Sequence, residues 1–392
     1  MNLTILSDLD DTLISTNVGQ FFPKYFSDLG NALKDLGPNK SIQKQIFYAV
    51  RQMEKNLDPG KLLSEIFAEN FYTPLGTTAA THKGDILNFY HQEYPKLKTL
   101  TTFRPEAPEL VNWCQQQNIV FAIATNPVFP EVATRERIIW AGLDPEAFPF
   151  FTTYDYFHFT KPNLAYYAEC LGRLGWPEGK IVMLGDDPIR DIAPMQALGF
   201  PTFLIHQEKN GYKGDEGTIA DVKRWLEKVN SQPDAEPQFT PEANLAIMRS
   251  TPAVMDSWLR LLPEAAFHAE TKPGEWNLTE IFWHLADFED EVYLRQWEGL
   301  AADSTTQITP PETSRWAEER AYRQRDPKEA HQKFYKSRMA SLEILASLIE
   351  KGMLDQSFQH PVFSQSTLAE LISFVSRHDR IHLRQSWETM NI

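Results

Sequence analysis

An apolar segment near the start of the chain leads into two acids with a fixed spacing. Residues 3–7 run into Asp-Leu-Asp-Asp-Thr at positions 8–12. A buried strand that ends in polar residues is typical of parallel α/β sheets, which bind ligands at the carboxyl ends of their strands. Strand alternation would put Asp8 and Asp10 on one face. Because two carboxylates held so close repel each other, the pattern predicts a hard divalent cation such as Mg²⁺.

Strand and helix signals alternate over the first part of the chain, which predicts a doubly wound parallel α/β sheet. Residues 16–100 instead carry helical periodicity with no convincing strand, so we expect a helical insertion over the carboxyl edge of the sheet. The further strands are predicted at 119–124, 181–184 and 202–205, and the helices between them at 108–117, 130–141 and 165–174.

The pattern changes to helices alone after a Pro-containing polar stretch. The length of 392 residues suits two domains, and we place a linker at 229–241 between a first domain at 1–228 and a second at 242–392. Four helices of bundle length predict an all-α four-helix bundle. They are expected at 242–262, 277–300, 328–351 and 367–390.

Composition limits the classes of function. A net charge of −15 argues against a nucleic-acid partner, which would require clustered Lys and Arg. No apolar run is long enough to span a bilayer, and no export signal precedes the first strand. The two cysteines, Cys114 and Cys170, suit reduced thiols. The sequence therefore predicts a cytoplasmic protein that acts on a small molecule, with no membrane partner.

Three further polar fragments stand where a parallel sheet presents its loops. Thr125 and Asn126 follow the strand at 119–124, Lys161 precedes a helix, and Asp186 and Asp187 follow the strand at 181–184. Because the carboxyl ends of parallel strands meet at one edge, we expect these side chains to converge with the acids after the first strand.

The residue types match the needs of phosphoryl transfer. Asp8 is the expected nucleophile, since a carboxylate can attack phosphorus to give an aspartyl-phosphate. Asp10 would protonate the leaving oxygen and later activate water. Thr125 and its neighbour Asn126 would bind the phosphoryl group. Lys161 would neutralise charge on the nucleophile and the phosphate, because charge neutralisation dominates catalysis of this reaction.

The expected magnesium ligands are acids and a carbonyl oxygen. Asp186 would bind Mg²⁺ together with Asp8 and the backbone carbonyl of Asp10, and Asp187 is an equal alternative to Asp186. Asp191 is a candidate partner for Lys161 or for metal-bound water.

In order and spacing, these fragments resemble the four motifs of the haloacid dehalogenase-like (HAD) superfamily over residues 1–228. The resemblance implies a Rossmann-like sheet, a C1-type cap formed by residues 16–100, and a Mg²⁺-dependent phosphatase. It also implies that Asp10 selects phosphatase or phosphomutase chemistry, because the family's dehalogenases lack this second acid. Phosphomutase activity therefore stays an alternative to hydrolysis of a small phosphorylated metabolite.

The insertion is rich in aromatic residues, which we interpret as its own packing rather than as a substrate cage. A helical cap that closes over the sheet excludes water and favours small phosphate esters over protein substrates. The aromatic residues in question are Phe21, Phe22, Tyr25, Phe26, Phe47, Tyr48, Phe71 and Tyr72.

A histidine constellation marks the second domain. His378 and His382 are four residues apart and so share a helical face, and His284 lies in another predicted helix that could face them. Three imidazoles predict a site for Zn²⁺, Ni²⁺ or Fe²⁺. These residues and the segment at 276–286 resemble the DinB-like superfamily over residues 242–392. The resemblance implies that the three histidines form a metal site and that a thiol-dependent transferase is one candidate activity.

Two alternatives for the second domain stay open. In one, the bundle is a metal-dependent thiol transferase or hydrolase and carries the main activity. In the other, it is a non-enzymatic sensing or dimerising module that regulates the phosphatase, with the bundle as the interface of a homodimer.

Overall fold

The computed structural model describes residues 1–206, 212–233, 237–270, 274–302, 312–360 and 364–390. The chain forms two compact units. The first comprises residues 1–167 and 177–238, and the second comprises residues 168–176 and 239–392. Residues 234–236 of the predicted linker lie outside the described residues, and its first three residues belong to a helix that ends at Ser231.

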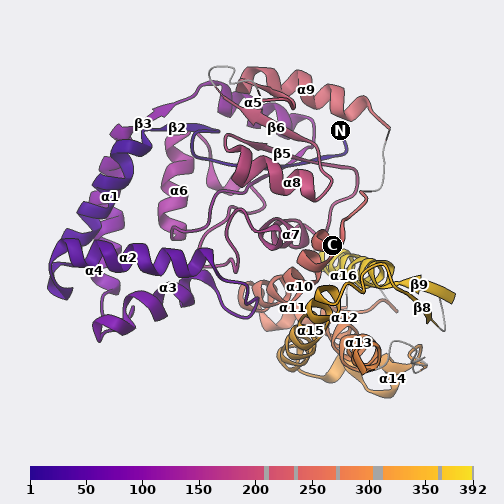
Figure 1. Ribbon diagram of the computed structural model, residues 1–392. Coiled ribbons are helices and arrows are strands. Elements are labelled where there is room, and N and C mark those ends of the chain that lie inside the picture. Colours follow the sequence, from indigo (N-terminus) through magenta and orange to yellow (C-terminus); the bar gives the residue numbers. More distant parts are fainter. Residues whose placement is uncertain (207–211, 234–236, 271–273, 303–311, 361–363, 391–392) are drawn as a thin grey trace. The chain divides into compact units, whose positions relative to one another are not determined.

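A five-stranded sheet forms the centre of the first unit (Figure 1). Its strand order is β4-β1-β5-β6-β7, and all its pairs are parallel. Every residue of β1 and β6 is buried, as expected for strands covered on both faces. The predicted doubly wound sheet is confirmed. The strands are β1 (Leu3–Ser7), β4 (Val120–Ile123), β5 (Lys180–Gly185), β6 (Thr202–Ile205) and β7 (Glu216–Gly217).

Helices pack on this sheet through apolar faces. Helices α5 (Glu106–Gln116) and α9 (Ile219–Ser231) lie along one face, and α8 (Ala193–Ala197) lies on the other (Figure 1). Leu110 of α5 and Trp225 of α9 belong to the same hydrophobic core as the strands. Helix α6 (Glu131–Trp140) follows β4. Helix α7 (Leu164–Arg173) precedes β5, and its residues from 168 onward belong to the second unit.

The insertion after β1 is helical and begins and ends in a pair of short strands. Strand β2 (Ile14–Thr16) pairs antiparallel with β3 (Thr101–Phe103), a pairing that the sequence did not predict. Between them, the described residues form helices and short turns. The cap helices are α1 (Val18–Ala32), α2 (Asn39–Glu54), α3 (Leu63–Phe71) and α4 (Lys83–Asn88).

The first strand ends before the acids that follow it. Strand β1 stops at Ser7, and Asp11 has a φ of 54°, so the chain turns instead of continuing as a strand. The amide of Leu13 donates to the carbonyl of Leu9 at 2.9 Å and closes this turn. Strand alternation therefore does not set the relative orientation of Asp8 and Asp10, because both residues follow the end of β1.

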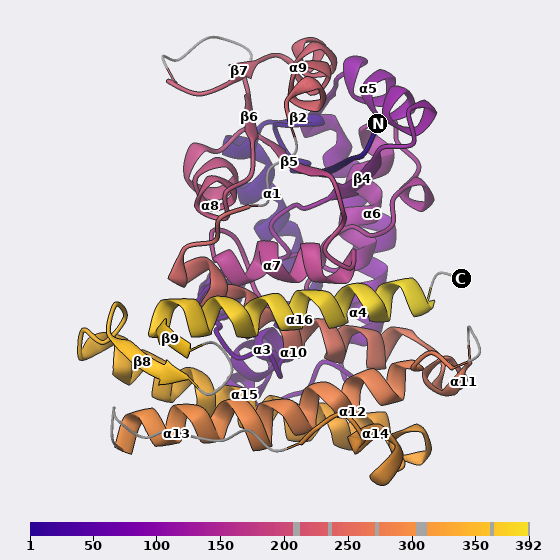
Figure 2. The same cartoon turned by 90° about the vertical axis from the view of Figure 1, so that its right-hand side faces the viewer.

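The second unit contains long helices that run alongside one another (Figure 2). The predicted four-helix bundle is confirmed. At the start of α12, the Asn277 side chain accepts from the Glu280 amide at 2.9 Å and the Glu280 carboxylate accepts from the Asn277 amide at 3.0 Å, so a capping box forms. The helices are α10 (Pro241–Leu261), α12 (Leu278–Phe288), α13 (Leu294–Ala302), α15 (Pro327–Glu350) and α16 (Leu368–Met390).

Smaller elements complete this unit and were not predicted. They are α11 (Glu264–His268), α14 (Trp316–Glu319) and the antiparallel pair of β8 (Ser357–His360) and β9 (Ser364–Thr367).

The helix predicted at 277–300 is interrupted. A π turn over Glu289–Tyr293 separates α12 from α13. Such a turn inserts one extra residue and changes which face of the helix points inward. Glu289 is fully buried there, so its carboxylate requires a cation inside the bundle.

Arg338 of α15 supplies that cation. Its guanidinium, 0% exposed, donates to the Glu289 carboxylate at 2.7 Å and to Asp379 of α16 at 3.0 Å. The Thr251 hydroxyl donates to Asp379 at 2.8 Å, and the Met248 carbonyl accepts from Arg338 at 2.8 Å. This network joins α10, α15, α16 and the π turn, and every charge in it is paired.

We expect Arg338→Met to destabilise the bundle strongly. Methionine fills part of the space but leaves Glu289 and Asp379 buried without a cation, which costs about 3–5 kcal/mol. Urea denaturation of the full chain measures this loss. The matched control is Arg295→Met, which removes an exposed pair with Glu298 and should cost less than about 1 kcal/mol. Equal losses in the two variants would contradict the assigned role of the network.

Candidate functional site

Lys161 lies at the centre of the polar cluster in the first unit. Its ammonium donates to Asp8 Oδ1 and to Asp191 Oδ1, both at 2.6 Å. All three side chains are buried, Lys161 being 3% exposed. The backbone amide of Lys161 also donates to Asn126 Oδ1 at 3.2 Å. Residues from the ends of β1, β4 and β5 and from the loop before α7 therefore meet at one place, as the sequence predicted.

Three carboxylates crowd around this ammonium. Asp8, Asp186 and Asp191 each place an oxygen within 4.8 Å of the others. Burial raises the pKa of Asp8 well above its ordinary value, and the neighbouring Asp191 and Asp186 add to the rise that Lys161 opposes. Burial and Asp191 likewise raise the pKa of Asp186 to about 7. A single ammonium thus leaves excess negative charge, and the oxygen donor set suits a hard divalent cation.

This group contains neither Asp187 nor the carboxylate of Asp10. Asp187 Oδ1 accepts from the amides of Ile189 and Arg190, at 2.8 and 3.0 Å, and so caps the turn that follows it. The acid grouped with Asp186 is Asp191, four residues farther along the chain than Asp187. The structure therefore places Asp186 in the acidic group, while the free amides of the turn hold Oδ1 of Asp187, and which of the two acids binds the ion stays a prediction.

Asp10 is held by a residue that the sequence analysis missed. The buried guanidinium of Arg137, on α6, donates to its carboxylate, and the Thr16 hydroxyl donates to it at 3.1 Å. One signal was available, because Arg137 lies four residues from both Ala133 and Ala141, which are fully buried. A charge on the apolar face of a helix needs a buried partner.

Thr125 and Asn126 follow β4 beside the Lys161 cluster. Thr125 is buried, and its carbonyl accepts from the Tyr166 hydroxyl at 2.7 Å and from the Thr152 hydroxyl. These bonds fix the backbone at the end of β4, where it would have to present donors to a phosphoryl group. The Thr12 hydroxyl contacts Asp186 at 3.5 Å, a contact that was also not predicted.

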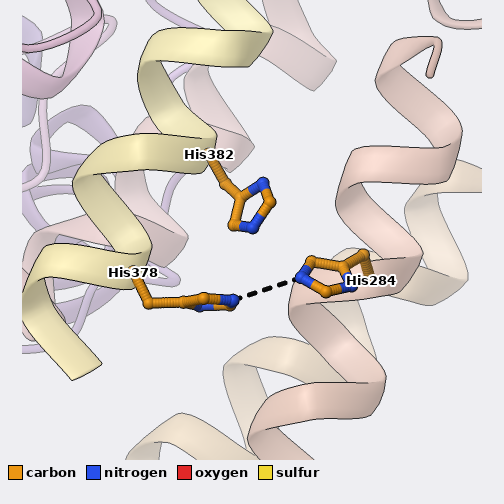
Figure 3. Close-up of side chains that lie close together, drawn as sticks. All are labelled: His284, His378 and His382. Atoms are coloured by element: carbon orange, nitrogen blue, oxygen red, sulfur yellow. Dashed lines mark hydrogen bonds between the residues drawn. The ribbon is translucent and has the colours of Figure 1, made fainter. Parts of the chain in front are cut away.

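The three histidines of the second unit meet as the sequence predicted (Figure 3). His378 and His382 project from successive turns of α16 toward His284 on α12 (Figure 3). One nitrogen from each lies within 4.8 Å of the others, and the Nε2 atoms of His284 and His378 are 3.1 Å apart. Such a spacing allows a single ion to contact all three rings.

Burial keeps these imidazoles neutral. It lowers the pKa of His284 to about 3, with a further contribution from His382, and it also lowers the pKa values of His378 and His382. Neutral imidazole is the form that binds metals. The arrangement can therefore accept a cation over the whole neutral range without first losing protons.

The surroundings orient the rings. His382 Nδ1 lies 2.9 Å from Gln385 Oε1, which leaves its other nitrogen for the cluster. The rings of Trp276 and Phe288 pack against His284, with centroids 4.9 and 4.4 Å away. An all-nitrogen donor set in an apolar setting fits Zn²⁺, Ni²⁺ or Fe²⁺ better than Mg²⁺.

The structure also bears on the predictions for the two cysteines and for membrane-spanning segments. Cys114 and Cys170 are buried and unbridged. Over the ranges that the structure describes, no helix combines the length and the apolar character that a bilayer crossing requires.

Comparisons with known proteins agree with this division of the chain. The family model described as haloacid dehalogenase-like hydrolase matches residues 3–199, and that of the DinB superfamily matches residues 247–386. No curated protein matches the chain.

Solved structures resemble each part separately. A HAD phosphatase from Thermococcus onnurineus is 17% identical, with a TM-score of 0.38, covering 58% of this chain and 98% of that one. The L-2-haloacid dehalogenase from Xanthobacter autotrophicus is 13% identical, with a TM-score of 0.36, covering 58% and 99%. YfiT from Bacillus subtilis, a probable metal-dependent hydrolase with an unusual four-helix bundle topology, is 17% identical, with a TM-score of 0.35, covering 42% and 94%.

Proposed function

Because this chain belongs to the haloacid dehalogenase-like hydrolases, whose family model matches residues 3–199, we propose that it is a Mg²⁺-dependent phosphatase of a small phosphomonoester. The observation that carries the proposal is the bonding of the Lys161 ammonium to both Asp8 and Asp191, with Asp186 in the same group. A nucleophilic carboxylate, a fixed cation and a set of acidic oxygens are what phosphoryl transfer requires.

Each residue has a distinct role in the proposed reaction. The Asp8 carboxylate attacks phosphorus as the bond to the leaving oxygen breaks. Asp10, which has to take up a proton and release its ion pair with Arg137 before this step, gives that oxygen the proton. Asp10 then takes a proton from water, which attacks the aspartyl-phosphate, releases inorganic phosphate and regenerates Asp8. Lys161 neutralises charge on both partners, while Thr125 and Asn126 bind the phosphoryl oxygens.

The acids around Lys161 would hold the magnesium ion. Asp8 and Asp186 are the proposed ligands, with Asp191 as the third acid of the group, and the ion would supply positive charge to the transferring phosphoryl group. Phosphomutase activity uses the same two acids, Asp8 and Asp10, and remains the alternative. The two are separated by whether inorganic phosphate is released or the phosphoryl group reappears on an acceptor.

Asp8→Asn should abolish hydrolysis. The amide is a poor nucleophile, so we expect the rate of phosphate release from a generic aryl phosphate to fall on the order of a thousandfold or more. Asp187→Asn is the matched control, since Asn caps a helical turn as well as Asp does, and it should keep most of the activity. Unchanged turnover in a folded Asp8→Asn variant would refute the assignment.

Magnesium should stabilise the chain through Asp186 and not through Asp187. Ligand binding to the folded state raises the melting temperature by mass action. In thermal melts of the full chain, we expect a Mg²⁺-dependent rise in wild type and in Asp187→Asn, and none in Asp186→Asn. The reverse pattern would show that the acids have been assigned wrongly.

A second candidate function belongs to the bundle. The histidine cluster favours a metal-dependent enzyme, either a thiol transferase or a hydrolase, because a metal with three protein ligands keeps a position open for a substrate or water. A sensing or dimerising role for the bundle, a homodimer through it and a cytoplasmic location all remain predictions.

The bundle metal should depend on the paired histidines. We expect elemental analysis of the purified full chain to find Zn²⁺, Ni²⁺ or Fe²⁺, and the double variant His378→Ala/His382→Ala to lose at least about nine-tenths of it, because one imidazole cannot hold the ion alone. His268→Ala, in the same unit but outside the cluster, is the control. Equal metal in the double variant and the control would end this proposal.

A further inference from the structure

A cavity of about 650 Å³ lies within the first unit, between the cap helices and the loop after β4. This volume is in the range of small-molecule sites. Its walls are mainly aromatic rings and aliphatic side chains, including Phe26, Phe47 and Tyr72 from the cap and Phe129 from the loop.

The cavity corrects our interpretation of the cap aromatics. Their rings do pack on one another, for example Phe26 on Phe47 with centroids 4.3 Å apart. They do not fill the cap, however, because a cavity remains beside them. Six of the eight residues line this hollow: Phe22, Tyr25, Phe26, Phe47, Phe71 and Tyr72.

Two lining residues connect the cavity to the reacting groups. Asn126 lines it and accepts from the Lys161 amide at 3.2 Å, next to the nucleophile Asp8. Phe129 also lines it, and its ring lies 4.4 Å from the guanidinium carbon of Arg137, which holds Asp10. The cavity is therefore connected to the proposed nucleophile through Lys161 and to the proposed acid through Arg137, although neither Asp8 nor Asp10 lines it.

Apolar side chains outnumber polar ones in the lining, and four of the polar residues are paired with one another. Arg190 donates to Glu54 at 3.1 Å, and both side chains are partly exposed, which places this pair at the rim. The hydroxyls of Tyr25 and Tyr90 are 2.9 Å apart and satisfy each other. A sugar or nucleoside would lose water from many hydroxyl groups here and regain few hydrogen bonds.

We propose that this cavity binds the leaving group of the phosphomonoester and that this group is a bulky apolar alcohol or phenol, aromatic in preference. The inference rests on the phosphatase function proposed above and specifies its substrate class. Apolar rings gain free energy from burial and from ring contacts with the aromatic wall. In this proposal the residues at the sheet edge bind only the phosphate, while the cap residues select the alcohol or phenol that is esterified to it.

Paired substrates test the selectivity in the wild-type full chain with Mg²⁺. Each pair has leaving groups of similar acidity, so that the chemical step is matched: phenyl against 2-naphthyl phosphate, and a hexose phosphate against 2-phenylethyl phosphate. We expect kcat/KM to be about tenfold higher for the naphthyl ester and about a hundredfold higher for the phenylethyl ester. Equal values, or a preference for the hexose phosphate, would overturn the inference.

A pair of variants on α2 tests whether the cavity causes the preference. Val50 lines the cavity, whereas Tyr48 on the same helix is exposed and lies outside the lining. Val50→Trp should lower kcat/KM at least about tenfold more for 2-naphthyl phosphate than for phenyl phosphate, because the larger ring needs more of the occupied space. Tyr48→Trp should change neither. Equal loss for both esters in Val50→Trp would contradict the proposal.

A binding measurement separates this inference from the phosphatase proposal. In the Asp8→Asn full chain with Mg²⁺, titration calorimetry should show 2-naphthyl phosphate binding at least about tenfold tighter than inorganic phosphate. Tight binding without turnover of any ester by wild type would refute the phosphatase function and leave the cavity assignment standing. Turnover without this difference in binding would refute the cavity assignment and leave the phosphatase.

Discussion

The ammonium of Lys161 is shared by two carboxylates, and the candidate site of the first unit depends on that sharing. Asp8 and Asp191 are both buried, as is Lys161 itself, and each of these charges would be costly without the others. The sheet brings them together, because β1 lies between β4 and β5 and the three parallel strands end at one edge. Asp186 adds a third acid to the group, so that the ion pairs alone leave negative charge uncompensated. A divalent cation would complete the balance and turn a set of costly buried charges into a site for an anionic ester.

The sheet and the cap of the first unit have different proposed tasks. The strand ends carry groups suited to phosphoryl chemistry, and the cap, joined to the sheet through the β2–β3 pair, carries an apolar cavity that suits a leaving group. Phe129 and Arg137 connect the cavity to the strand ends. Phe129 lines the cavity and contacts Arg137, and Arg137 donates to the carboxylate of Asp10. The bundle also shows that a buried charged group needs a partner of opposite charge or must be neutral. Its buried acids Glu289 and Asp379 are paired with Arg338, while its histidines avoid the cost of burial by staying neutral and available to a metal.

Much of this could be predicted from the sequence where a local pattern determines the structure. The strand at 202–205 was predicted with its observed bounds because a short apolar run between turns has few other solutions. The meeting of Asp8, Lys161 and Asp186 followed from the geometry of parallel sheets. What could not be predicted depends on packing. Asp191 was predicted as a partner of Lys161, but its place beside Asp186, while Asp187 caps the turn, depends on which amides the turn leaves free. The hollow among the cap aromatics has no signature in their spacing, because the same rings could have filled the space.

The central claim is that Asp8 takes the phosphoryl group from the substrate. The most direct measurement is to locate that group by mass spectrometry after acid quenching of the full chain, turning over an aryl phosphate with Mg²⁺. An aryl group leaves without protonation, so an Asp10→Asn variant should still form the intermediate and should hydrolyse it slowly. We expect one phosphoryl group on the peptide that contains residue 8, and more of it in this variant than in wild type. Continued turnover with no phosphoryl group on Asp8, or with the group on another residue, would contradict the account.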